Sequence, residues 1–213
     1  MLDYIEEVCK AGKTDIIFYS DNCSGQQKNG FMLALYIYEV DKLDINSITH
    51  KYLIKGHTQN EGDSAHSLIE RQVKRILKSG PIYTPEGLIT AIRTAKKKGD
   101  PFKVKELCYD DFYNIKILPN EVGPMNIKAF RISEVKVLKV MKESPTSVFY
   151  KYSYAEEYQE VKILKDKNHE KNIQLVKCFK EKPGITSKKK DGLVDLCEKN
   201  LIIKPYHLFY KNL

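Results

Sequence analysis

The sequence predicts an α/β fold built around a parallel pair of strands that a buried helix connects. Residues 15–19 and 47–55 are rich in β-branched and aromatic side chains, which favour strands, and the first run is apolar enough for a strand buried on both faces. Residues 26–40 predict a largely buried helix, because the stretch from Phe31 to Tyr38 is apolar on almost every side. A strand, a helix and a strand in this order form a βαβ unit, whose two strands run parallel.

Helix caps and breakers place the helices around this unit. Residues 2–11 predict a short helix that ends at Gly12. Thr58 and Glu61 have the spacing of a capping box, so a helix is expected to begin near Gln59. Its apolar stripe recurs at helical spacing and consists of Ala65, Leu68, Ile69, Gln72, Val73 and Ile76.

The next helix has a clear start and a clear end. Thr84 and Pro85 form an N-cap followed by proline in the first turn, which predicts a helix from this point. The helix is expected to run to about Lys98, where lysines favour the carboxyl end and Gly99 stops it. Residues 109–113 predict one more short helix.

From residue 132 the pattern changes from helical spacing to alternation. Residues 132–142, 147–154 and 160–164 predict three strands of a small antiparallel sheet with one solvated face. Helices are expected at 192–199 and from Pro205 onward. We therefore divide the chain into a partial α/β core with a helical extension, 1–131, and a β-rich appendage with C-terminal helices, 132–213.

The charge of the chain is compatible with a nucleic-acid partner. The formal net charge is +8, and residues from Glu134 onward carry 17 Lys and Arg against 11 Asp and Glu. This excess suits a platform for a phosphate backbone, although many basic proteins bind no nucleic acid. Tyr150, Tyr152 and Tyr154 alternate along one predicted strand, which fits a stacking surface for bases and fits an aromatic packing face better.

Several classes of protein are disfavoured by the same sequence. The five cysteines are scattered and form no Cys-x-x-Cys pair, so neither a disulfide framework nor a zinc ribbon is indicated. The absence of a signal-peptide pattern and of any apolar run of membrane-spanning length favours the nucleus or cytoplasm, with no secretion and no membrane partner.

The candidate site follows the two predicted parallel strands. Asp21 comes at the end of the first strand, and the carboxyl ends of such strands are where ligands usually bind in α/β sheets. The second strand leads into a segment dense in titratable groups: His57, Glu61, Asp63, His66 and Glu70. Carboxylate-rich sites prefer hard cations, so Mg²⁺ or Mn²⁺ bound by Asp21, Asp63 and Glu61 is the metal hypothesis.

Plainer explanations exist for the acidic residues. Asp21 fits a turn or helix cap, and acidic residues are favoured in the first turn of any helix. Glu70 and Lys74 have the spacing of an ordinary solvated ion pair. A Cys23 nucleophile activated by His57 is conceivable, but a small cysteine after a strand is more often a packing residue.

At two stretches the chain resembles a known family. YSDNCSGQQKN, residues 19–29, and LIKGHTQNEGDSAHSLIERQ, residues 53–72, are similar to the signatures of a transposon-derived domain of unknown function that is common in arthropod genomes. The C-terminal run 202–210 is similar to the end of that family. The resemblance implies an RNase H-like core of the DDE transposase type, in which Asp21, Asp63 and His57 would be the catalytic residues and DNA the partner.

The sequence differs from this family at its N-terminal end. The first strands of an RNase H-like fold form a meander that carries the first metal-binding Asp, and only a helix-length segment precedes residue 15. We therefore expect a fragment without full strand-transfer activity, with an unpaired sheet edge open to an upstream portion or a second copy. The alternative is a non-enzymatic module for nucleic acid or protein that keeps the fold.

Overall fold

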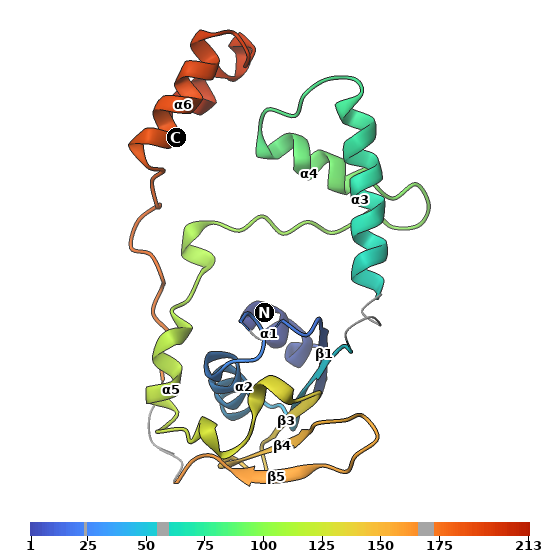
Figure 1. The fold of residues 1–213 in the computed structure, drawn as a ribbon, viewed down its shortest axis with the longest axis vertical. Coiled ribbons are helices and arrows are strands. Elements are labelled where there is room, and N and C mark those ends of the chain that lie inside the picture. Colours follow the sequence, from blue (N-terminus) through green and yellow to red (C-terminus); the bar gives the residue numbers. More distant parts are fainter. Residues whose placement is uncertain (24, 55–59, 166–172) are drawn as a thin grey trace. The chain divides into compact units, whose positions relative to one another are not determined.

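The chain folds as two units, which we call the sheet unit and the helical unit. The computed structural model describes residues 1–23, 25–54, 60–165 and 173–213. The sheet unit comprises residues 1–58 and 113–176, and the helical unit comprises residues 59–112 and 177–213 (Figure 1). Each unit is therefore assembled from two separate stretches of the chain.

The sheet unit contains one mixed sheet of five strands in the order β1-β2-β3-β4-β5. The strands are β1 (Asp15–Ser20), β2 (Ser47–Tyr52), β3 (Val137–Met141), β4 (Ser147–Lys151) and β5 (Gln159–Lys162). β1 and β2 pair in parallel, as predicted, and every later pair is antiparallel. The predicted α/β class is confirmed.

The predicted division at residue 131 does not coincide with a division in the structure. β3 pairs along β2, with Val137 opposite Lys51 and Leu138 opposite His50. The antiparallel strands therefore continue the sheet that the parallel pair begins. Alternation along the chain revealed these strands, but it carries no information on which strand they pair with.

Two helices, α1 (Leu2–Lys10) and α2 (Gly30–Lys42), pack on one face of the sheet. Phe18 of β1 links them, because its ring centroid lies 6.3 Å from that of Tyr4 and 6.1 Å from that of Tyr36. The strand residues on this covered face form the core with the buried side of α2 and include Ile16, Ile48, Leu138, Val140 and Val148.

The expectation that the first strand is buried on both faces is wrong. Ile16 is buried, whereas Ile17 is 53% exposed and Tyr19 is 58% exposed. Residues opposite in register share a face, so the other face continues through Thr49 and Lys139. β1 is an edge strand with helices on one side, and half of its apolar side chains therefore face solvent.

Short helical segments lead the chain back to β3. They are the 3₁₀ turn Ile115–Ile117, α5 (Leu118–Glu121), and the 3₁₀ turns Ile127–Ala129 and Ile132–Glu134. Leu118 of α5 is fully buried in the core. This connection is therefore part of the sheet unit and not a surface linker.

The helical unit begins with α3 (Glu61–Leu77) and α4 (Pro85–Arg93). Its other elements are the 3₁₀ turn Tyr109–Asp111, α6 (Ser187–Glu198), the 3₁₀ turn Lys204–Tyr206 and α7 (His207–Lys211). The two stretches of this unit are joined where Tyr83 stacks on Tyr206 at 4.9 Å between centroids. The hydroxyl of Tyr210 also donates to the Tyr83 carbonyl.

The predicted helix start near Gln59 is correct, but the predicted cap is wrong. Asn60 is the N-cap, and its side chain accepts hydrogen bonds from the backbone N–H groups of Gly62 and Asp63. The Asp63 carboxylate completes the capping box by accepting from the Asn60 N–H at 2.9 Å. Asn60 and Asp63 have the same three-residue spacing as Thr58 and Glu61, so spacing alone did not distinguish the two pairs.

The later helices also differ from the prediction in their limits. α4 ends at Arg93, so lysines 96–98 follow the helix instead of ending it, and α6 begins at Ser187, earlier than expected. The Thr94 hydroxyl donates to the Thr90 carbonyl at 2.7 Å, a local bond that competes with helix continuation. No helix among the described residues is long and apolar enough to cross a membrane.

Candidate functional site

Asp21 lies at the carboxyl end of β1, directly beside the end of β2. Its side chain is exposed, and its Oδ1 accepts a hydrogen bond from the backbone N–H of Cys23 at 3.3 Å. This bond is typical of an Asx turn, as the plainer sequence interpretation expected. It engages one carboxylate oxygen and leaves the group accessible from solvent.

A chain of hydrogen bonds runs behind this turn and joins three elements. The Tyr36 hydroxyl of α2 lies 2.8 Å from Nδ1 of His50, and Nε2 of His50 lies 2.9 Å from the Ser20 hydroxyl. Ser20 in turn donates to the Asp21 carbonyl at 2.9 Å. This last bond favours the tautomer in which His50 Nε2 donates to Ser20 and Nδ1 accepts from Tyr36.

Burial keeps the side chains of this hydrogen-bond network uncharged at neutral pH. His50 is 1% exposed, and burial, assisted by the nearby charge of Lys28, lowers its pKa to about 4. Burial raises the pKa of Tyr36 far above its usual value. A neutral imidazole that donates a hydrogen bond to Ser20 cannot accept the proton of that hydroxyl, so it is unsuited to activate Ser20 as a nucleophile. The hydrogen-bond network therefore serves to fix the end of β1.

Lys28 fixes the same turn from the other side. Its side chain is buried, donates to Oδ1 of Asn22, and donates to the Ser133 carbonyl at 3.2 Å. The ammonium also lies 4.6 Å from the centroid of the Tyr52 ring. Burial, with the charge of Lys136 as a second cause, lowers the pKa of Lys28 to about 8.

The remaining predicted site residues belong to the helical unit or lie outside the description. Glu61, Asp63, His66 and Glu70 are exposed on α3, and Glu70 pairs with Lys74 at 3.4 Å, as expected of a solvated ion pair. His57 lies outside the described residues. Asp21 belongs to one unit and Asp63 to the other, so their shared metal site stays a prediction.

The donor set fits a divalent cation only in part. Asp21 offers an accessible carboxylate, which suits Mg²⁺ or Mn²⁺. Asp63 spends its Oδ2 on the helix cap, and Glu61 is an exposed residue of the first turn. All three residues could supply oxygen ligands, but Asp63 already serves as a helix cap.

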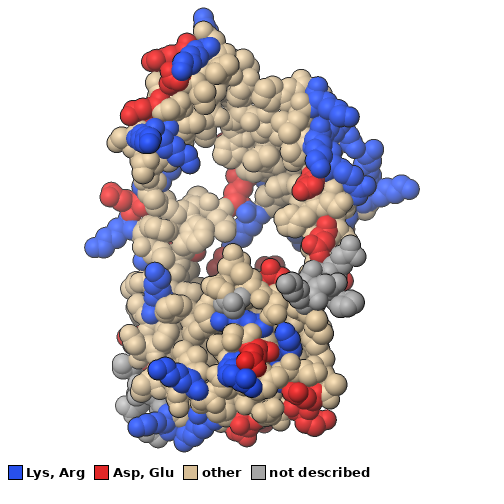
Figure 2. All heavy atoms as spheres, viewed as in Figure 1, with Lys and Arg blue, Asp and Glu red and all other residues tan. Residues whose placement is uncertain are grey.

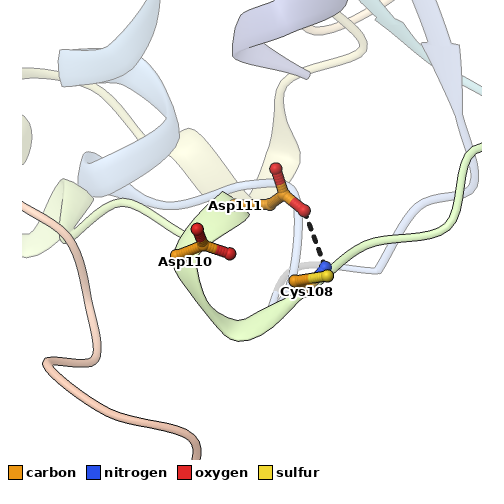
Figure 3. Close-up of side chains that lie close together, drawn as sticks. All are labelled: Cys108, Asp110 and Asp111. Atoms are coloured by element: carbon orange, nitrogen blue, oxygen red, sulfur yellow. Dashed lines mark hydrogen bonds between the residues drawn. The ribbon is translucent and has the colours of Figure 1, made fainter.

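Cys108, Asp110 and Asp111 form a separate cluster in the helical unit (Figure 3). Their ligand atoms lie within 4.8 Å of one another, and all three residues are exposed. Asp111 accepts a hydrogen bond from the Cys108 N–H at 2.6 Å, which caps the short turn Tyr109–Asp111. Capping accounts for this arrangement, and we assign no ion to it.

The sequence model of one family, DUF7869, a domain of unknown function, matches residues 2–158. The chain belongs to this family. The DUF7869 match begins in α1 and ends just before β5, so it includes Asp21, Lys28, His50 and Asp63. No curated protein and no solved structure matches the chain.

Two residues of the candidate site, His50 and Lys28, were not singled out by the sequence analysis. His50 interrupts the apolar pattern of β2, and a titratable residue at such a position is a usable signal of a buried hydrogen bond. Lys28 stands just before the apolar helix α2 and gives no such signal. Only the fold shows that its ammonium reaches Asn22 and Ser133.

Proposed function

We propose that this DUF7869 protein is a transposase-derived, DNA-directed protein whose sheet unit is a partial RNase H-like core. The observation that supports DNA as the partner is the division of charge between the units. The helical unit carries 19 Lys and Arg against 12 Asp and Glu, whereas the sheet unit carries 17 against 16. Nearly all of the net charge of +8 therefore belongs to the helical unit.

The sheet unit supplies features that this proposal requires. The parallel pair β1 and β2 brings Asp21 to the strand ends, and two hydrogen-bonded groups, His50 and Lys28, hold the adjoining turn. Among the described residues β1 pairs with β2 alone, so its other edge is open to a further strand. An upstream strand with an additional carboxylate, or a second copy of the chain, would occupy that edge under this proposal.

DNA binding by the whole chain tests the proposal. Affinity for duplex DNA should fall steeply between about 50 and 200 mM salt, because each neutralised phosphate releases counterions. Fluorescence anisotropy with a labelled duplex measures both the affinity and its salt dependence. Failure of the parent chain to bind at about 50 mM salt would reject DNA as the partner.

A metal at this site would be Mg²⁺ or Mn²⁺ held by Asp21, Asp63 and Glu61. Such an ion would supply Lewis-acid stabilisation of phosphoryl oxygens. The residues of the chain would hold the ion and orient the strand end, with Asp21 fixed through Ser20. Two-metal catalysis needs further carboxylates to offset repulsion between the cations, so we expect the chain to lack strand cleavage.

The second candidate function is that of a non-enzymatic interaction module. The capping role of Asp63 favours this candidate, because a helix cap gives the carboxylate a purpose that needs no metal. An assay on supercoiled plasmid with Mg²⁺ or Mn²⁺, with Asp21→Ala as the control, tests whether the chain cleaves DNA. Both candidates predict no nicking, so metal-dependent nicking that is lost in the control would show a complete enzyme and overturn the non-enzymatic module.

A further inference from the structure

One face of α3, together with its C-cap residue, carries a row of four exposed cations: Arg71, Lys74 and Arg75 in the helix and Lys78 at the C-cap. Their spacing of three, four and seven residues places them together on one side of the helix. At 1.5 Å per residue the row spans about 10 Å, close to three phosphate intervals along one DNA strand. Of the acidic residues of α3, Glu70 alone is paired with this row, through Lys74.

A second group of cations lies beside this row. The amide Nε2 of Gln72 donates to the Thr94 hydroxyl at 3.1 Å, and Gln72 also accepts from Arg75 at 2.7 Å. These bonds bring the end of α4 to the middle of α3. Lysines 96–98 follow Thr94 after one buried residue, Ala95, and are exposed. Figure 2 shows Lys and Arg side chains gathered over the C-terminal half of α3 and the segment after α4.

We propose that this basic face, formed by Arg71, Lys74, Arg75, Lys78 and lysines 96–98, binds the phosphate backbone of duplex DNA. The inference rests on the proposed function and names the surface that performs it. It moves the contact away from the appendage, 132–213, where the sequence had suggested it. The strands of that appendage belong to the sheet unit, which is nearly neutral, whereas residues 177–213 belong to the helical unit and carry 9 Lys and Arg against 4 Asp and Glu. Tyr150 is buried against Phe130 instead of being open to bases.

The arrangement of α3 favours a polyanion in water over a lipid surface. A helix that lies on a membrane inserts an apolar face next to its basic face. The apolar stripe of α3 is half-buried along its whole length, and α4 is the helix held against it by the Gln72–Thr94 bond. The exposed side of the helix therefore presents charge, and its partner needs to offer regularly spaced anions.

The test compares triple substitutions of equal charge within the same unit. One variant carries Arg71→Gln, Lys74→Gln and Lys78→Gln, and a second carries Lys96→Gln, Lys97→Gln and Lys98→Gln. The matched control carries Lys188→Gln, Lys189→Gln and Lys190→Gln on α6. Glutamine keeps helix propensity close to that of lysine and arginine, and circular dichroism with thermal unfolding checks that each variant folds.

Duplex affinity is measured by fluorescence anisotropy as a function of salt. Each of the first two variants should bind on the order of tenfold more weakly, and its salt slope should fall by about one unit for each lost phosphate contact. The α6 control should keep nearly the parent affinity. A fourth variant with Lys96→Arg, Lys97→Arg and Lys98→Arg should also keep it, because the charge is retained.

Different results separate failure of the surface from failure of the function. A parent chain that binds no duplex overturns the DNA function itself. Binding by the parent with equal losses in all three Gln variants overturns the assigned surface and leaves the function standing. Tighter binding to phosphatidylserine vesicles than to DNA, lost in the same two variants, overturns DNA as the partner of this surface.

Discussion

Glu39 and His50 are buried titratable residues whose responses to pH have opposite signs. Glu39 is 0% exposed, and neither carboxylate oxygen has a hydrogen-bond partner within the described part of the chain. Burial raises its pKa to about 7. Stability from the protonated form is therefore complete below pH 4.5 and is lost as the pH rises through about 7. His50 behaves oppositely, because its lowered pKa costs stability as the pH falls from 6.5 through about 4.

The first prediction concerns Glu39→Gln. At pH 8 the variant should be more stable than the parent by up to about 3 kcal/mol, because the parent must keep an uncompensated carboxylate buried there. Between about pH 4.5 and 6.5 the parent profile should be nearly flat, since the two residues compensate. The variant should instead gain stability with pH, because only the His50 contribution remains.

Urea unfolding at a series of pH values measures this effect. Glu134→Gln is the matched control, because Glu134 is an exposed carboxylate of the same unit that pairs with Arg131 at 3.0 Å. The control should keep the profile of the parent. A Glu39→Gln variant that loses stability at pH 8 would show that the Glu39 carboxylate has a compensating partner.

At the scale of single elements, α3 shows how a local cap decides a boundary. We predict that Asn60→Ala lowers the free energy of unfolding by about 1 kcal/mol, because two first-turn N–H groups lose their acceptor. Asn60→Asp should retain most of the stability, since a carboxylate caps equally well and favours the helix N-terminus. Thermal unfolding followed by circular dichroism distinguishes the two variants. An Asn60→Ala variant as stable as the parent would show that the cap contributes little.

The sequence was sufficient for elements whose signal is local and insufficient for those that depend on neighbours. The six-residue stripe of α3 was predicted correctly as its more covered side, and the strands β1 and β2 were predicted as a parallel pair. The exposure of Ile17 was missed, because an apolar run does not reveal that its strand lies at a sheet edge.

The candidate site, like the fold, was predicted only where its signal is local in the sequence. The position of Asp21 at a strand end followed from local pattern. The roles of Lys28 and His50 did not, because their partners Ser133 and Tyr36 lie on other elements. Such contacts depend on tertiary packing, and no spacing rule within one segment contains them.

At the scale of the whole molecule, the two units should differ in their response to truncation. Ending the chain after Val176 removes only part of the helical unit, so the sheet should stay folded. Ending it after Ser133 removes β3, β4 and β5, and the core loses Leu138 and Val140. We expect this shorter chain to be unfolded, because each buried aliphatic residue lost costs about 2–5 kcal/mol.

Circular dichroism and denaturant unfolding of the two truncated chains measure this difference. A cooperative transition in the shorter chain would mean that α1, β1, α2 and β2 fold without the antiparallel strands. It would then restore the division at residue 131 that the sequence suggested.

The pairing of β2 with β3 also has a consequence for the order of events during synthesis. These neighbours in the sheet are separated along the chain by all of α3 and α4. A ribosome therefore releases the first helices of the other unit while β2 still lacks its antiparallel neighbour. Contacts this distant in sequence form slowly, and both edges of the nascent β1–β2 pair stay open meanwhile. Chaperone demand should therefore be greatest in the interval before β3 emerges.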